Sequence, residues 1–76
     1  MKKIVSGRDE AVKFLKNFAR DHGLHFSLVD DVRTVEFGHI YDKPPAPDVV
    51  RKTVYQWKIV TDEAEQKIWV EIEKIE

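Results

Sequence analysis

The sequence contains no cysteine, and only three glycines and three prolines among its 76 residues. Without cysteine the chain has no disulfide framework, no thiolate nucleophile and no cysteine-bound zinc. Small secreted domains usually depend on disulfides, so we expect a protein of a reducing compartment, the cytoplasm. The glycines, Gly7, Gly23 and Gly38, are isolated from one another, and this excludes a glycine-rich phosphate loop.

Long hydrophobic runs and an excess of one charge are also lacking. No apolar stretch approaches the roughly 18 residues that span a bilayer. The charged start MKKIVSGRDE lacks a secretory pattern, so we expect no membrane association. The net charge of −1 gives no general attraction to nucleic acid. The charges are uneven, however: residues 1–22 carry six bases and three acids (+3), whereas residues 62–76 carry two bases and six acids (−4).

The hydrophobic residues that are present suffice for a folded core. They make up 42% of the chain, and aromatic residues make up 11%. A chain with this many large apolar groups folds rather than remaining disordered. Its length is too small for two separate cores, so we expect a single domain over residues 1–76.

Residues 6–23, SGRDEAVKFLKNFARDHG, have the features of an amphipathic helix. Ser6 is the predicted N-cap, since a serine hydroxyl accepts hydrogen bonds from the first backbone N–H groups of a helix. Side chains that share one helical face recur at spacings of three and four residues, at Ala11, Phe14, Leu15, Phe18 and His22. Gly23 is predicted to end the helix, because glycine readily takes the positive φ found there.

After Gly23 the hydrophobic period changes to two residues, which indicates strands. The expected strands are LHFSL (24–28), RTVEFGHIY (33–41), KTVYQWKIVT (52–61) and KIWVEIEKI (67–75), with KKIV (2–5) as a further candidate. Asp30 and Asp31 predict a turn, and the polar residues 62–66 predict another. These connections are too short for helical crossovers, so the strands are expected to be antiparallel.

The sequence therefore predicts an α+β fold. One N-terminal helix packs on an antiparallel meander of four strands, or five if residues 2–5 form a strand, in the order (β)-α-β-β-β-β. This order is similar to that of cystatin-like folds, in which a sheet wraps around a helix. The similarity covers the order of elements alone, because the sequence has no cystatin inhibitory motif.

All three prolines fall in the stretch DKPPAPDVV, residues 42–50. Pro44 and Pro47 have the PxxP spacing of polyproline II ligands for aromatic grooves. Proline also stiffens a loop between two strands, since it fixes φ and lacks a donor for the ladder. PxxP matches are frequent by chance, so we interpret the stretch as a rigid loop and keep the docking peptide as the alternative.

The predicted sheet has apolar residues on both faces, and one helix covers only one of them. We assign Phe26, Phe37, Trp57 and Val70 to the face beneath the helix. By strand alternation, the second face receives Val29, Ile40, Val54, Val60, Trp69 and Ile75, interspersed with Lys58, Glu71 and Glu73. Tryptophan and branched aliphatic residues among charges are typical of a protein–protein interface. We therefore predict a homodimer or a protein partner at the second face around Trp69. The alternative is that the proline loop covers this face, or that the apolar residues are scattered without function.

Basic side chains on the helix support a second functional hypothesis. Lys13, Lys16 and Arg20 have i, i+3, i+7 spacing on the side away from Phe14, and Arg8 lies near the helix start. Such a stripe is suited to nucleic-acid phosphates. Charged residues on an outer helix face are more often a solvated surface, so nucleic-acid binding is the alternative rather than the main prediction.

The sequence offers little support for catalysis or metal binding. His22, His25 and His39 lie among acidic residues, but no pair has the spacing of a known metal site. Ser6 and Ser27 lack the flanking glycines of a nucleophile elbow. We therefore expect a binding protein that is not an enzyme and that has no metal or other cofactor.

Overall fold

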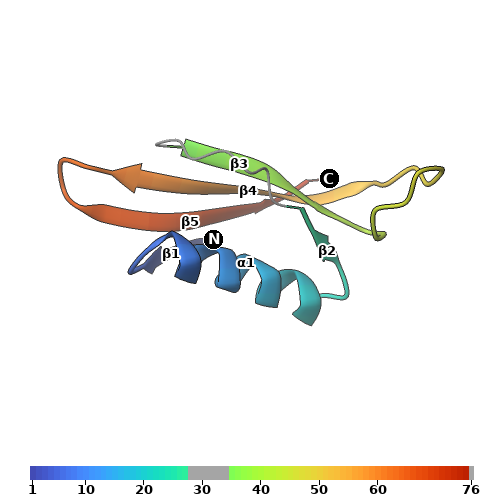
Figure 1. Ribbon diagram of the computed structural model, residues 1–76, viewed down its shortest axis with the longest axis horizontal. Coiled ribbons are helices and arrows are strands. Elements are labelled where there is room, and N and C mark those ends of the chain that lie inside the picture. The colour runs from blue at the N-terminus through green and yellow to red at the C-terminus, as the bar shows by residue number, and fades with distance from the viewer. Residues whose placement is uncertain (28–34, 76) are drawn as a thin grey trace.

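The computed structural model of the protein describes residues 1–27 and 35–75 (Figure 1). The predicted turn at residues 30–31 and Val29 lie outside the described residues. The elements are β1 (Lys2–Val5), α1 (Arg8–Asp21), β2 (His25–Phe26), β3 (Val35–Tyr41), β4 (Thr53–Asp62) and β5 (Lys67–Lys74). The strands form a curled antiparallel sheet in the order β1-β5-β4-β3-β2, and α1 lies along one face of it. This confirms the predicted α+β fold, with residues 2–5 as the fifth strand.

The ends of α1 follow the sequence signals, with one correction. The N-cap is Gly7, not Ser6. The Ser6 side chain does not cap the backbone, because its Oγ and its backbone N–H both hydrogen-bond the Glu10 carboxylate. These bonds lower the pKa of Glu10, since they favour its ionised form. At the other end Gly23 has φ +68°, which confirms the predicted glycine at the helix end.

The core lies between α1 and the face of the sheet that the helix covers. Ala11, Leu15 and Ala19 are buried along the inner side of α1. They meet side chains from the three long strands, at Ile40, Trp57, Ile59, Val70 and Ile72. Leu15 is fully buried at the centre of this layer. Burying a leucine of this kind contributes about 2 kcal/mol before its loss of conformational freedom is counted.

Strand β3 faces the opposite way from the prediction. Phe37, which was expected beneath the helix, is 59% exposed, whereas Ile40 is fully buried there. The reason is the pairing of Gly38 with Trp57 across the ladder. A Cβ on residue 38 would lie 2.5 Å from the Trp57 ring, so only glycine leaves room for the indole. Gly38 must therefore face inward, and by alternation Phe37 faces outward.

An ion pair fixes the start of α1 to β3. The Arg8 side chain donates from Nε to Glu36 Oε1 at 2.7 Å and from Nη2 to Oε2 at 3.1 Å. The Glu36 side chain is only 6% exposed. A carboxylate this buried needs such a partner, because charge is strongly disfavoured away from water. Glu36 shares the inward face with Gly38, so this pair also holds β3 in the observed orientation.

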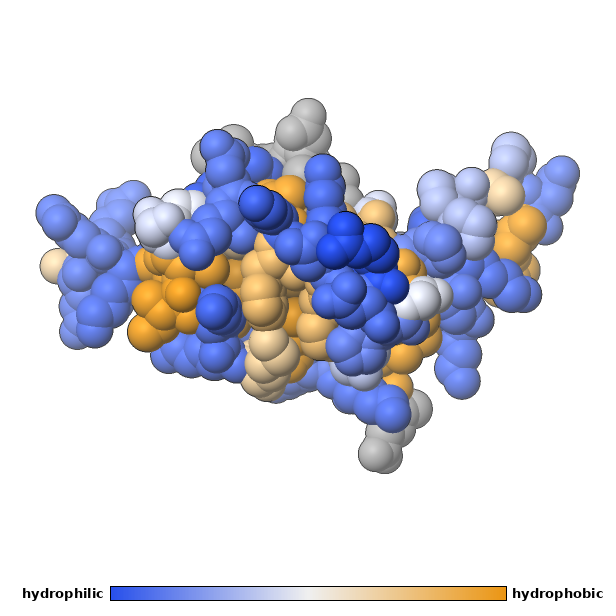
Figure 2. Space-filling model, turned by 90° about the horizontal axis from the view of Figure 1, so that it is seen from below, coloured by the Kyte–Doolittle hydropathy of each residue, from blue (hydrophilic) through white to orange (hydrophobic). Residues whose placement is uncertain are grey.

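The proline stretch lies in the loop between β3 and β4, which projects from one end of the molecule (Figure 1). Its base is closed by hydrogen bonds from Asp42 N–H to Lys52 O and from Lys52 N–H to Asp42 Oδ1. The Arg51 guanidinium lies 3.8 Å from the centre of the Tyr41 ring. Val50 is 90% exposed within the loop. In Figure 2, a small orange group lies among blue and pale spheres at the end of the molecule where this loop projects.

Candidate functional site: the open face of the sheet

The face of the sheet opposite α1 is the candidate site, and we call it the open face. Residues that pair across an antiparallel ladder point to the same side. Because Trp57, Ile59, Val70 and Ile72 point toward α1, their neighbours in sequence point away from it. The open face comprises Lys2, Ile4, Phe37, His39, Gln56, Lys58, Val60, Asp62, Lys67, Trp69, Glu71 and Glu73. The Tyr41 ring lies beside that of His39, just beyond a shift in the β3–β4 register. Within residues 1–27 and 35–75, no helix or further strand covers it.

An apolar patch lies on the open face toward the end that carries the β4–β5 turn. Ile4 of β1, Trp69 of β5 and Val60 of β4 form one row, since Ile4 pairs with Trp69 and Trp69 with Val60. Phe37 of β3 lies beside this row, opposite Lys58. Ile4 is 65% exposed and Phe37 is 59% exposed. Exposed apolar side chains that are contiguous in this way are characteristic of interaction sites.

Trp69 is held in place by charged neighbours. The Lys2 ammonium lies 4.5 Å from the centre of the indole ring, which is a cation–π contact. In addition, Trp69 Nε1 donates a hydrogen bond to Glu71 Oε2 at 3.2 Å. These contacts fix the rotamer of a large aromatic side chain before a partner arrives. A side chain fixed in advance loses less conformational entropy on binding.

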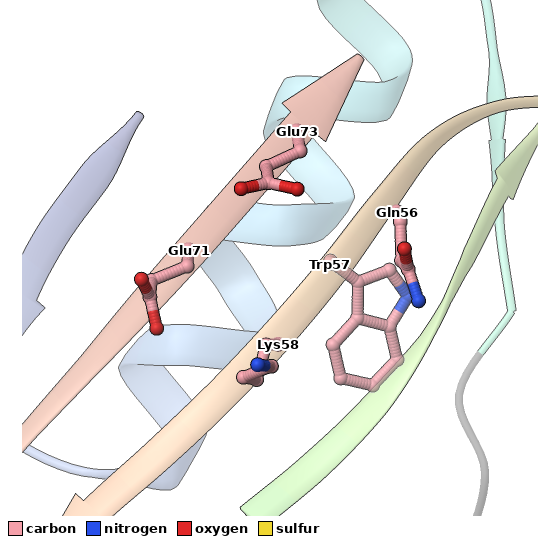
Figure 3. A pocket seen from close by; sticks show the side chains of 5 residues that line it. All are labelled: Gln56, Trp57, Lys58, Glu71 and Glu73. Atoms are coloured by element: carbon pink, nitrogen blue, oxygen red, sulfur yellow. The ribbon is translucent and has the colours of Figure 1, made fainter. Parts of the chain in front are cut away.

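A charged row lies next to the apolar row. Lys2 pairs with Glu71, Glu71 with Lys58, and Lys58 with Phe37. Figure 3 looks onto this surface, with α1 behind the strands and with Lys58 and Glu71 on neighbouring strands. Lys58 makes no ion pair with any described residue, so its charge remains available to a partner.

The hollow in Figure 3 lies between β4 and β5, and Gln56, Trp57, Lys58, Glu71 and Glu73 line it. Its volume is about 100 Å³. Pockets for drug-sized ligands usually have volumes of about 300–1,000 Å³. The open face is therefore shaped for contact with another surface rather than for enclosing a small molecule.

The structure brings together only some of the residues predicted at the interface. Lys58, Val60 and Trp69 are neighbours at the patch. Val54 lies at the other end of β4, about 20 Å away for six residues of strand, and its carbonyl accepts a hydrogen bond from Ile75 N–H. The predicted position of Ile40 is wrong, because Ile40 is fully buried beneath α1. Other residues of β3 lie on the open face instead, because Gly38 must face inward to leave room for the Trp57 ring.

Ile4 and Phe37 are the open-face residues that the sequence reasoning missed. Ile4 lies in a strand of four residues, too short for its alternation to show which side is buried. Phe37 was assigned to the core because it is apolar. The signal that places it outside is Gly38, since a glycine within a strand often marks a close approach by another group.

The basic residues of the alternative hypothesis lie on the other side of the molecule. Lys13, Lys16 and Arg20 are exposed on α1. The guanidinium of Arg8 is bound to Glu36 and does not extend the stripe freely. Lys16 and Arg20 also border an apolar hollow at the end of α1, which is lined by Ala19, Gly23, Leu24, His25, Phe26 and Pro45. Nucleic-acid binding through these groups stays a prediction.

The three histidines come from three different segments of the chain. His22 follows α1 and its Nδ1 lies 2.8 Å from Phe18 O, whereas His25 and His39 are in different strands. Among the described residues, no three histidine or acidic side chains lie close enough together to hold a metal ion. His39 Nδ1 is buried, and it has no hydrogen-bond partner in the part of the chain described.

The comparisons with known proteins add no assignment to this geometry. No protein-family model matches the sequence, and no curated protein or solved structure matches it significantly. Among the described residues, no helix is long and apolar enough to pass through a bilayer, since α1 has 14 residues and is rich in charge. The open face is therefore the feature of the molecule that indicates a function.

Proposed function

We propose that this protein is a small binding module that acts through protein–protein contact on the open face. The observation that carries the proposal is the contiguous patch of Ile4, Phe37, Val60 and Trp69 on a face that no described element covers. Burying an exposed isoleucine or phenylalanine in a partner contributes on the order of 1.5–3 kcal/mol each. Two such side chains beside a fixed tryptophan have the composition of an interface centre.

Binding is favoured over catalysis by the character of the surface. The hollow on the open face is small, and the charged groups around it are two carboxylates, Glu71 and Glu73, and one lysine, Lys58. We also propose that binding takes place in the cytoplasm, because a chain this short without cysteine is suited to a reducing compartment. The partner is either another protein or a second copy of this chain.

The test is a charge placed in the patch. Ile4→Asp and Phe37→Asp put a carboxylate where an apolar contact is proposed, and neither side chain contributes to the core beneath α1. The wild type and the variants are compared for self-association by sedimentation velocity and for capture of proteins from a lysate of the source cells. We expect both variants to lose the complexes that the wild type forms.

Lys13→Glu is the control, since it changes the charge on the far side of the molecule. Circular dichroism checks that every variant is folded. If the two Asp variants form the same complexes as the wild type in both assays, the open face is not the binding surface and the proposal is wrong.

A further inference from the structure

We propose that the partner of the open face is a second copy of this chain, packed sheet against sheet about a two-fold axis that runs along the strands between β4 and β5. This rests on the proposed function and adds the identity of the partner and the geometry of the complex. The cross-strand register supports this dimer, because the register decides which side chains meet when the open face of one copy is laid on that of another.

Two rows of side chains cross the open face at right angles to the strands. In strand order β1-β5-β4-β3, the charged row is Lys2, Glu71, Lys58, Phe37. The apolar row begins with Ile4, Trp69 and Val60. Within each row the side chains lie at one level along the strand direction, since they are paired residues.

Rotation about a two-fold axis parallel to the strands leaves each row at its level along the strands. It exchanges the positions of the strands on the two sides of the axis. With the axis between β4 and β5, the β4 strand of one copy lies over the β5 strand of the other, and β1 lies over β3. Lys58 then faces Glu71 of the second copy, and Val60 faces Trp69 of the second copy. Each contact occurs twice, as an interface related by two-fold symmetry requires.

The outer strands match in the same way. Lys2 of β1 faces Phe37 of β3 in the second copy, since both belong to the charged row. A lysine ammonium above a phenylalanine ring is a favourable cation–π contact. Asp62 likewise faces Lys67 of the second copy, because these two residues pair across β4 and β5. Opposite charges that pair within one sheet therefore pair between sheets under this operation.

A two-fold axis perpendicular to the strands lays β4 over β4 and reverses the level of each row. Placed at the level of Lys58, it brings Lys58 onto Lys58 of the second copy, and such like charges are unfavourable at an interface. Placed at the level of Val60, it brings Lys58 over Asp62 and Glu71 over Lys67 of the second copy. Only the axis along the strands also brings Lys2 of β1 over Phe37 of β3. Charge reversal at Lys58 and Glu71 distinguishes the two axes, because mixing the variants restores the contacts only where Lys58 faces Glu71.

The charge of the open face also favours self-association over a strongly charged partner. On β1, β5 and β4 its lysine and acidic residues number three and three, so their sum is zero: Lys2, Lys58 and Lys67 against Asp62, Glu71 and Glu73. The Arg51 guanidinium over the Tyr41 ring lies outside these strands and adds one positive charge. A neutral face of alternating charges exerts no net attraction on an acidic or basic surface. It attracts a surface whose positive and negative charges alternate in the same way but are displaced by one strand, so that opposite charges meet. The open face of a second copy is such a surface.

The size of the face sets the expected affinity. Four strands at about 4.8 Å spacing and about 3.3 Å per residue give a face of roughly 19 by 26 Å. Its area of roughly 500 Å² is below the roughly 800 Å² that each partner buries in a standard interface. We therefore expect a dimer that dissociates in the micromolar range, which sedimentation equilibrium measures directly between about 1 and 500 μM.

The decisive experiment uses two charge reversals, Lys58→Glu and Glu71→Lys. Alone, each variant places like charges together across the axis, so we expect its dimer to be at least about tenfold weaker than the wild type. Mixed in equal amounts they restore both contacts, because Glu at 58 of one copy meets Lys at 71 of the other. The mixture is expected to form a heterodimer within about threefold of the wild-type affinity.

Recovery in the mixture cannot arise from contacts within one chain, since neither chain has changed on mixing. Circular dichroism and thermal melting establish that both variants are folded. If Glu71→Lys, which loses the acceptor for Trp69 Nε1, does not fold, the reciprocal variants Asp62→Lys and Lys67→Asp replace the pair and decide the question by the same criterion.

Two results overturn the proposal. One is a wild-type protein that stays monomeric up to about 500 μM; the other is a mixture that associates no better than the separate folded variants. A monomeric wild type whose capture of another protein is lost in Phe37→Asp overturns the second copy as partner and leaves the proposed binding face standing. If no open-face variant loses either self-association or the capture of another protein, the binding face is overturned as well.

Discussion

The close approach of Gly38 to Trp57 predicts that a single added methyl group will destabilise the fold. The Cβ of Gly38→Ala would lie 2.5, 2.7 and 2.9 Å from three atoms of the indole, whereas unstrained contacts are about 3.5–4.0 Å. Trp57 is 1% exposed, so the ring has no free space to enter. Overpacking of this kind destabilises by about 1–3 kcal/mol, and the near 1 Å overlap favours the upper half of that range.

The assay is thermal unfolding followed by tryptophan fluorescence. For a domain of this size we expect the melting temperature to fall by about 10–20 °C. Trp57→Phe provides the control, because it removes the ring atoms that the new methyl group meets. In that background Gly38→Ala should cause little further loss, which gives a coupling free energy of about 2 kcal/mol in the double-mutant cycle. An additive cycle, or an unchanged melting temperature for Gly38→Ala, would refute the steric account of β3.

Three further predictions concern the helix and its attachment. Arg8→Ala should lower the free energy of unfolding by about 3 kcal/mol in urea titrations, since it leaves the buried carboxylate of Glu36 without this partner. Ser6→Ala should lower the urea midpoint at pH 7, and this loss should shrink as the pH is lowered: because the pKa of Glu10 is lowered in the folded protein, its contribution is fully present above the ordinary glutamate pKa of about 4 and is lost as the pH falls through the folded value. Leu15→Ala should lower the free energy of unfolding by about 3 kcal/mol, because it leaves a cavity at a fully buried site.

The helix and the order of elements were predictable because their signals are local. The spacing of Ala11, Leu15 and the residues between them identifies the inner side of α1, and Gly23 marks its end without reference to the rest of the chain. The change of period after Gly23 identifies strands, and short connections make them antiparallel. Each of these inferences needs only a few consecutive residues.

The orientation of β3 was not predictable from its own residues. Val35 and Phe37 lie on one side of the strand by alternation, and Ile40 lies on the other. The alternation alone therefore does not show which side faces the core. The choice depends on two groups that are distant in sequence: the indole of Trp57, which requires Gly38 opposite it, and Arg8, which requires Glu36 beneath α1. A phase error in one strand exchanges both of its faces. The error therefore removed Phe37 from the predicted interface and placed Ile40 in it.

The two functional hypotheses involve opposite sides of the molecule, and this makes them compatible rather than exclusive. Packing two open faces together buries the patch around Trp69 and leaves both copies of α1 on the outside. Lys13, Lys16 and Arg20 of each copy would then face outward in opposite directions. A dimer of this form cannot place both basic stripes on one straight nucleic-acid segment. Any binding by these lysines and arginines would therefore join two separate strands or partners, and it would weaken with added salt far more than the neutral interface between the sheets.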